Sequence, residues 1–345
     1  MIWKAWFDID AAKVQKKTGF TLQHTEIICN FALDFVLNVF KAKMETVEIK
    51  KNSPRAWLLA ARPKTLSGAA VPVMIGVSLA LADAELYVDD AFSWVAAVLC
   101  LLFAFIMQID ANFVNDFFDY AKGTDDTATR LGPQRACAQG WVSLEAMKKA
   151  IAFTTCLACL VGLPLVLYGG LEMVLVGLLC VVFCFLYTTH LSYIGMGDVL
   201  VLVFFGIVPV CITYYLQYHT VTLQVFLASV ACGFVIDALL LVNNFRDRDT
   251  DRDAGKNTLV VRIGEQATLS FYLAAGVVPC IIGLVFWFNG HVLAFLLPLI
   301  YLVLHVSTLL KMKRIWKGRE LNECLGETAR NIFIYGVLVS LGLLL

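Results

Sequence analysis

Long apolar runs with few or no charged residues recur along this chain and constrain its fold more than any other feature. An α-helix needs about 20 apolar residues to cross a bilayer, and hydrocarbon forces each spanning segment to satisfy its own backbone hydrogen bonds. The hydrophobic share is 60%, above the roughly 45–50% of soluble domains. The sequence therefore predicts an all-α, polytopic membrane helix bundle of about nine transmembrane helices. The runs lie near residues 66–83, 92–113, 148–168, 170–188, 197–217, 222–243, 269–288, 291–310 and 330–345.

Charge is distributed unevenly between the two ends of these runs. All 27 Lys and Arg residues lie before the first run or in the segments 114–149, 244–268 and 311–330. Because cytoplasmic loops are enriched in Lys and Arg, these segments are expected on the cytoplasmic side of the membrane. The opposite ends carry Asp83, Glu85, Asp89, Asp90 and Glu172. The formal net charge of zero gives no reason to expect nucleic acid as a partner, whereas a lipid bilayer is required.

Residues 1–54 differ from the rest of the chain. They mix charges with a short apolar segment near residues 27–40 that Asp34 interrupts, and both a surface-lying helix and disorder fit this pattern. The layout of a cleavable signal peptide is missing. Met44 begins a more ordinary N-terminus, so we expect 1–54 to be an extension, of which residues 1–43 need not belong to the native protein. The membrane domain is expected at residues 55–345.

One polar stretch, NFVNDFFDYAKGTDD from Asn112 to Asp126, follows the second apolar run. At about 100° per residue, one helix face collects its amides and carboxylates, while the phenylalanines between them point elsewhere. The members of this face are Gln108, Asn112, Asn115, Asp116 and Asp119.

A second stretch, from Asn243 to Thr258, has the same character and follows the sixth run. Asn243, Asp247 and Asp251 repeat at i, i+4 and i+8. Both stretches lie on the predicted cytoplasmic side, and the pattern is that of a weak internal repeat. The two stretches are therefore expected to form two halves of one site.

Carboxylates at the end of a membrane helix require compensation, because an unpaired charge at a helix centre costs about 2.5–3.5 kcal/mol or more. Hard oxygen ligands suit Mg²⁺, which prefers one or two carboxylates together with phosphate oxygens. The expected metal ligands are Asp116, Asp119, Asp125, Asp247 and Asp251. Nearby cations suit the remaining oxygens of a diphosphate. They are Lys122, Arg130, Arg246 and Lys256. The alternative, that the charges are solvated loop residues, fits the outlying Asp126, Arg248, Arg252 and Asp253 better.

These motifs resemble those of the UbiA superfamily of membrane prenyltransferases, which carry NDxxD with a further Asp, and DxxxD. Asn115, Asp116, Asp119 and Asp125 match the first motif, and Asp247 with Asp251 match the second. The resemblance implies a UbiA-like bundle in which Mg²⁺ and these residues, Asn115 included, activate a polyprenyl diphosphate.

Several blocks resemble, more narrowly, the 1,4-dihydroxy-2-naphthoate polyprenyltransferases of menaquinone synthesis. Over residues 55–345 this resemblance implies transfer of a polyprenyl group from polyprenyl diphosphate to 1,4-dihydroxy-2-naphthoate, giving demethylmenaquinone, CO₂ and diphosphate. It also implies a bacterial inner membrane and an active site that faces the cytoplasm. The blocks are ARPKTL at 61–66, QI..N..NDFFDY..G.D at 108–125, RLGPQR at 130–135, FFG to YYLQ at 204–217, and NNFRD to VRIG at 243–264.

Further residues are candidates for the acceptor or prenyl pocket. An arginine can hold an aromatic carboxylate, and aromatic faces can stabilise an allylic cation, although interfacial contacts and ordinary helix packing are alternatives for each. The candidates are Arg62, Asn112, Tyr187, Tyr193, Tyr215 and Asn243. The chain departs from the superfamily at Thr188, Thr189 and His190, where Gly-Gly-Pro is usual, and this difference bears on the acceptor pocket.

Three rival functions differ in what they require of the sequence. A prenyltransferase acting on 4-hydroxybenzoate or homogentisate would carry the same metal motifs. A CDP-alcohol phosphotransferase would hold its aspartates in one continuous motif, which this chain lacks. A divalent-cation or proton-coupled transporter would place polar residues through both halves of the membrane, whereas here they gather at one side.

Overall fold

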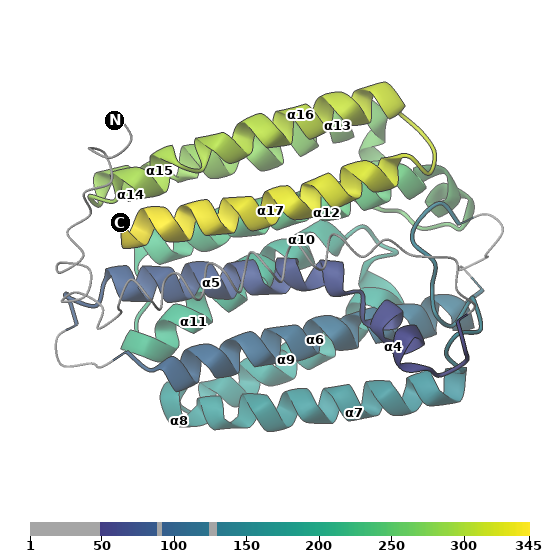
Figure 1. Ribbon diagram of the computed structural model, residues 1–345, viewed down its shortest axis with the longest axis horizontal. Coiled ribbons are helices and arrows are strands. Elements are labelled where there is room, and N and C mark those ends of the chain that lie inside the picture. Colours follow the sequence, from purple (N-terminus) through teal and green to yellow (C-terminus); the bar gives the residue numbers. More distant parts are fainter. Residues whose placement is uncertain (1–48, 88–91, 124–129) are drawn as a thin grey trace.

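The computed structural model describes residues 49–87, 92–123 and 130–345, and the chain forms a bundle of roughly antiparallel helices (Figure 1). Within these ranges, 9 helical segments are long and apolar enough to cross a membrane, as the sequence predicts. The expectations for residues 1–48 and for Asp125 fall outside the described residues.

The first half of the bundle contains four of these segments. The first is bent, and the third and fourth end in short helical turns. Their bounds are α4 Pro54–Ala61, η1 Pro63–Thr65 and α5 Leu66–Ala82; α6 Trp94–Ala121; α7 Leu144–Gly162, η2 Leu163–Leu165 and α8 Val166–Gly169; and α9 Glu172–Leu186 with the π-helical turn η3 Tyr187–Leu191.

The second half contains the other five. Their bounds are α10 Gly197–Val201, the π-helical η4 Leu202–Ile207 and α11 Val208–Tyr218; α12 Leu223–Asp253; α13 Leu259–Ile282 and α14 Leu284–Phe288; α15 Val292–Leu296 and α16 Leu299–Ile315; and α17 Leu321–Leu344.

Several helices extend beyond the apolar runs that predicted them. The runs end near residues 113 and 243, whereas α6 continues to Ala121 and α12 to Asp253. Hydropathy marks where the bilayer ends, but a helix continues for as long as its backbone and its packing allow. Asp116 and Asp119 therefore lie on the last turns of α6, and Asp247 and Asp251 on the last turns of α12.

The starts of the long helices follow from their capping residues. The hydroxyl oxygens of Ser93, Ser143, Thr222 and Thr258 each accept a hydrogen bond from the backbone N–H three residues later, at 3.3 Å. Such caps satisfy backbone groups that the helix itself leaves unpaired. They fix the first residues of α6, α7, α12 and α13.

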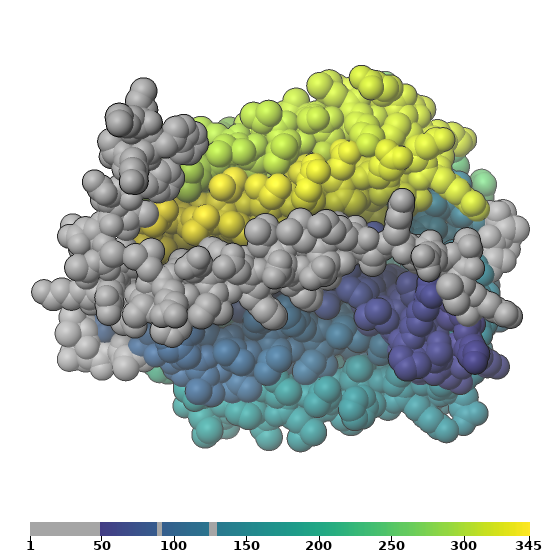
Figure 2. Space-filling model, viewed as in Figure 1, coloured from purple at the N-terminus to yellow at the C-terminus, as the bar shows by residue number. Residues whose placement is uncertain are grey.

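The core is built around α12, which packs against α13, α17, α11 and η4. A Cβ atom on Gly206 would lie 2.5 Å from the Cα atom of Gly233, so η4 and α12 meet backbone to backbone. Next to this core, α16 and α17 run side by side along the bundle (Figure 2). By contrast, only 6% of the apolar window of α9 is buried, so this helix is an outer one that faces lipid.

Candidate active site at the ends of α6 and α12

A cavity of ≈ 1290 Å³ opens between the last turns of α6 and α12 and continues between the helices. Many of the predicted site residues line it, from both halves of the bundle. They are Arg62, Asn115, Asp119, Arg130, Tyr187, Tyr193, Asn243, Asp247, Asp251 and Lys256. The two acidic stretches, far apart in sequence, thus reach one space.

Each acidic side chain at the cavity faces a cation. An oxygen of Asp119 lies 3.0 Å from Nη2 of Arg135, and one of Asp251 lies 3.8 Å from Nζ of Lys256. The carboxylate of Asp247 accepts two hydrogen bonds from Arg246, at 2.5 and 2.8 Å. The three carboxylate side chains keep 18%, 14% and 20% of their surface exposed, so a ligand in the cavity can reach them.

The donor set suits a metal that is shared with a phosphate ligand. Among the described residues, no three Asp, Glu, His or Cys side chains converge closely enough to hold an ion by themselves. Asn115 and Asp119 face the cavity from α6, and Asp247 and Asp251 face it from α12. These are oxygen ligands in pairs, and Mg²⁺ typically takes one or two carboxylates and fills its remaining positions with water and phosphate oxygens. The residues therefore fit Mg²⁺ in the presence of a diphosphate.

One side of the cavity is formed by residues 130–139, here called the 130–139 loop. Nε of Arg130 donates to the carbonyl of Pro133 at 2.8 Å, which folds the start of the loop. A Cβ atom on Gly132 would lie 2.5 Å from Nη2 of Arg246, so glycine allows the loop to contact α12 closely. The loop brings Arg130 and Arg135 to the cavity.

Asp116 does not line the cavity, although the sequence groups it with Asp119. Its side chain is fully buried, and its two oxygens accept hydrogen bonds from the backbone N–H groups of Ala136 and Cys137, at 2.9 and 3.0 Å. The helical face predicted from the sequence is wide, and a residue at its margin, such as Asp116, can point away from the cavity. In this structure Asp116 holds the end of the 130–139 loop.

Arg246 also lies behind the cavity wall and not on it. Its buried guanidinium donates to Asn243 at 2.8 Å and to Asn322 at 2.8 Å, in addition to Asp247. In this structure its guanidinium donates to these side chains, and the expectation that it binds a diphosphate stays a prediction. It orients Asp247.

Three more predicted residues lie off the cavity. Lys122 donates to the carbonyl of Thr189 at 2.8 Å and lies 4.3 Å from the ring centre of Tyr193. Asn112 donates to the carbonyl of Ala61 and thereby ties α6 to the bend between α4 and α5. Tyr215 packs edge-on against His219. Each has a structural contact that its residue type does not reveal in sequence.

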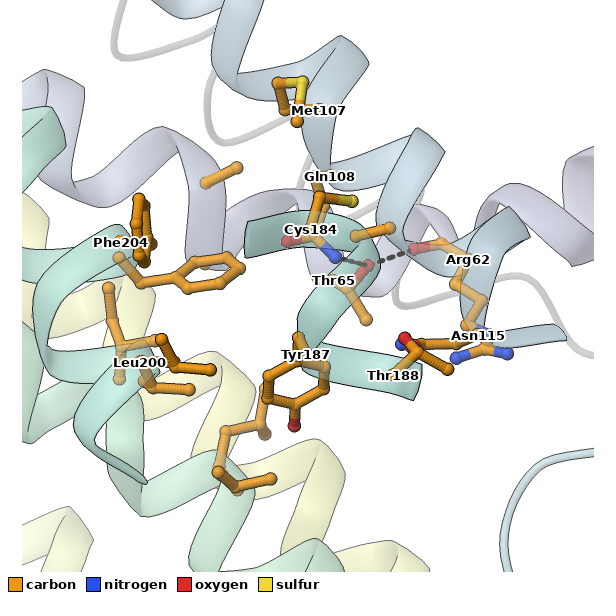
Figure 3. A pocket seen from close by; sticks show the side chains of 18 of the residues that line it. Arg62, Thr65, Met107, Gln108, Asn115, Cys184, Tyr187, Thr188, Leu200 and Phe204 are labelled. Atoms are coloured by element: carbon orange, nitrogen blue, oxygen red, sulfur yellow. Dashed lines mark hydrogen bonds between the residues drawn. The ribbon is translucent and has the colours of Figure 1, made fainter. Parts of the chain in front are cut away.

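The cavity continues inward from the carboxylates, where Arg62, Asn115 and Thr188 lie on one side, Leu200 and Phe204 on the other, and Tyr187 between them (Figure 3). Nη2 of Arg62 is buried and has no hydrogen-bond partner. Thr188 donates to Oδ1 of Asn115. The segment that departs from the superfamily pattern therefore contacts the first motif directly.

Sequence reasoning missed Arg135, Arg319 and Asn322 as residues of this site, all of which line the cavity. Arg135 lies in the RLGPQR block, so that block was a signal for it. Arg319 lies just before the ninth helical segment and Asn322 lies in its first turn, both far from either motif, and no sequence pattern indicates them.

Comparison with known proteins gives a consistent result. Residues 69–325 match the UbiA prenyltransferase family. The chain is 39% identical over 220 residues to the 1,4-dihydroxy-2-naphthoate octaprenyltransferase of Escherichia coli, covering 61% of this chain and 69% of that protein. It is 35% identical over 245 residues to the enzyme of that name from Mycobacterium tuberculosis, covering 66% of this chain and 81% of that protein.

Solved structures share the fold. A UbiA homologue from Aeropyrum pernix superposes with a TM-score of 0.61 at 14% identity, covering 80% of this chain and 96% of that one. A UbiA homologue from Archaeoglobus fulgidus bound to GPP and Mg²⁺ gives a TM-score of 0.55 at 14% identity, covering 83% and 99%. With the family match over most of the chain and the 9 apolar helices of the described residues, this chain is an integral membrane protein that belongs to the UbiA prenyltransferase family.

Proposed function

We propose that this protein transfers a polyprenyl group from polyprenyl diphosphate to 1,4-dihydroxy-2-naphthoate in a Mg²⁺-dependent reaction. The observation that carries the proposal is the set of carboxylates and cations from α6, α12 and the 130–139 loop around one cavity. The relatives from Escherichia coli and Mycobacterium tuberculosis, both named for this acceptor, favour it over other aromatic acceptors.

The polar end of the cavity is assigned to the diphosphate. Asn115, Asp119, Asp247 and Asp251 would hold Mg²⁺, which when bound neutralises the charge of the leaving diphosphate. Arg130, Arg135 and Lys256 lie at the same end, where they bind phosphate oxygens. Because charge grows on the diphosphate as the allylic C–O bond breaks, these fixed cations stabilise the transition state more than the ground state.

Ligand binding is expected to exchange the ion-pair partners in this part of the cavity. Asp119 now pairs with Arg135, and Asp251 with Lys256. A diphosphate would take over Arg135 and Lys256, which leaves the two carboxylates available for the metal. The pairing thus keeps both sets of charges compensated before the substrate arrives.

The acceptor is assigned to the space beside Arg62. The free Nη2 of Arg62 is a buried donor in need of a partner, and the carboxylate of a hydroxynaphthoate provides one. Tyr187 lies next to this space and Phe204 lies across the same cavity, and their aromatic faces can flank a naphthalene ring and an allylic cation (Figure 3). A bond then forms between a ring carbon and the allylic carbon, and the carboxylate leaves as CO₂. The product is the quinol form of demethylmenaquinone.

The polyprenyl chain is assigned to the apolar part of the cavity. That part is lined by Val174, Leu178 and Val181 of α9, which is the helix with the least buried apolar window. A chain that lies there remains next to lipid, so the length of the prenyl group is not limited by an enclosed wall.

The membrane and its sidedness are also part of the proposal. Within the described residues, the acidic motifs and the Lys and Arg residues share one end of the bundle, which by the positive-inside rule faces the cytoplasm. The relatives from Escherichia coli and Mycobacterium tuberculosis are bacterial, which favours the bacterial inner membrane.

A parallel assay of three acceptors tests the proposed function. Membranes that contain the protein receive Mg²⁺, a polyprenyl diphosphate and one of 1,4-dihydroxy-2-naphthoate, 4-hydroxybenzoate or homogentisate. We expect demethylmenaquinone and CO₂ from the naphthoate and no product from the other two. Prenylation of either benzene acceptor with the naphthoate untouched would contradict the assignment.

A further inference from the structure

We propose that Asn322, at the start of α17, is a positioning residue for the transfer reaction. It joins the second acidic motif to the 130–139 loop. It thereby fixes the orientation of the Asp247 carboxylate and the positions of the loop's cationic side chains. The inference rests on the proposed function, and it adds a residue that neither motif contains.

The amide of Asn322 connects two distant parts of the chain. Its Oδ1 accepts a hydrogen bond from Nη1 of Arg246 at 2.8 Å. Its Nδ2 donates to the carbonyl of Leu131 at 2.8 Å and to the carbonyl of Arg319 at 2.8 Å. An amide side chain suits this position, because it offers an acceptor to the guanidinium and a donor to the loop carbonyl at the same time.

The first arm of this contact acts on Asp247 through Arg246. The Arg246 side chain is 1% exposed, and it holds both carboxylate oxygens of Asp247. Without Oδ1 of Asn322, a buried guanidinium nitrogen loses its hydrogen-bond partner. Because an unsatisfied buried donor is unfavourable, the guanidinium is expected to rotate toward another acceptor. Asp247 would then lose the partner that fixes its orientation at the cavity.

The second arm acts on the 130–139 loop. At its start, the carbonyls of Arg130 and Leu131 accept from Arg319 at 3.2 Å and from Asn322 at 2.8 Å. At its far end, the loop is held by Asp116 through the N–H groups of residues 136 and 137. The part of the loop between these two anchors carries Arg135 toward Asp119.

The kinetics of two variants separate the contact of Asn322 with Arg246 from its contact with the 130–139 loop. Asn322→Ala removes both contacts, so the Mg²⁺ concentration for half-maximal rate and the KM for polyprenyl diphosphate should each rise, by up to the roughly 10- to 100-fold that is typical when outer-shell support of a metal ligand is lost. Asn322→Asp keeps an acceptor for Arg246 but has no donor for the Leu131 carbonyl. It should raise the KM while leaving the Mg²⁺ requirement close to that of the wild type.

Limited trypsin digestion of the detergent-solubilised full chain reports on the loop without any turnover. Both variants lose the donor to Leu131, so cleavage after Arg130 and Arg135 should be faster in both than in the wild type. Asn331→Ala is the matched control, because Asn331 is a buried asparagine on the same helix whose Nδ2 donates to Thr308 at 3.1 Å, away from the cavity. It should change neither the cleavage rate nor the Mg²⁺ requirement.

The proposal is overturned if Asn322→Ala retains the cleavage rate and KM of the wild type, or if Asn331→Ala reproduces its changes. Failure of the proposed function would be recognised separately, because the wild-type protein would then transfer no prenyl group to any acceptor. In that event the trypsin comparison still decides whether Asn322 anchors the loop.

Discussion

At the scale of single residues, Asp119, Asp247 and Asp251 differ from the other described acidic residues at this end of the bundle because they face the cavity. Replacing any one of them with alanine should lower prenyl transfer by at least about two orders of magnitude, since the loss of one electrostatic contact to a leaving group costs about 3 kcal/mol. Asp249→Ala is the control, because Asp249 lies on α12 with Asp247 and Asp251 but pairs with Lys317 at 2.6 Å outside the cavity. Near-native turnover in two of the three variants would mean that the reaction occurs elsewhere.

Asp116 should behave differently from Asp119, since it binds the 130–139 loop. Asp116→Asn removes one backbone acceptor in a buried place, with an expected cost of about 1–3 kcal/mol in the free energy of unfolding. The Mg²⁺ concentration for half-maximal rate should stay near that of the wild type, whereas Asp119→Asn should raise it. A thermal unfolding measurement and a Mg²⁺ titration of both variants check this. A raised Mg²⁺ requirement in Asp116→Asn without loss of stability would make Asp116 a direct metal ligand.

The contrast between Asp116 and Asp119 shows which features of the site the sequence could predict and which it could not. The helical period placed Asp247 and Asp251 on one helix face and Asn115 and Asp119 on another, because positions four residues apart share a helix face. It also grouped Asp116 with Asn115 and Asp119, because the helical period does not show which residues of other elements pack against each face. The partners of Asp116 come from a loop 20 residues later, and only the folded chain brings that loop to it.

At the scale of elements, the close contact between η4 and α12 depends on Gly206 and Gly233. Gly206→Ala places a methyl group 2.5 Å from the Gly233 backbone, so the two segments must separate. The expected cost is about 1–3 kcal/mol in the free energy of unfolding, as for other overpacked cores. Gly177→Ala, which meets nothing within 4 Å, should leave the unfolding temperature in detergent unchanged. Equal unfolding temperatures for both variants would contradict the close packing.

Element boundaries were only partly predictable. Hydropathy identified the spanning segments, because the bilayer demands apolar surface over a fixed thickness. It ended the second and sixth segments too early, because α6 and α12 continue past that thickness to Ala121 and Asp253. The bend at Arg62, with a φ angle of 50°, was not indicated by any run length.

At the scale of the whole molecule, the account requires the two motifs to face the same side of the membrane. In a background that lacks reactive cysteines, a cysteine replacing Asp249, whose side chain is 40% exposed, should react with a membrane-impermeant reagent from the cytoplasmic side only. One that replaces Leu86, which is 75% exposed at the other end, should react from the opposite side only. Labelling of both positions from one side would contradict the proposed topology.

Asn322 and Arg319 show what whole-molecule information adds. Their contacts with Leu131 and Arg130 join segments that lie far apart in the chain. A single sequence contains no pattern for such a pair, because each partner on the loop is a backbone carbonyl and carries no residue-specific signature.

The most direct test of the central claim, that the cavity between α6 and α12 is one Mg²⁺-dependent transfer site, uses the purified wild-type protein in lipid. A labelled polyprenyl diphosphate and 1,4-dihydroxy-2-naphthoate are supplied first with EDTA and then with excess Mg²⁺, and labelled product, CO₂ and diphosphate are measured together. We expect none of the three in EDTA and equal amounts of all three after Mg²⁺ is restored. Formation of labelled product in EDTA at the rate seen with Mg²⁺ would contradict that claim.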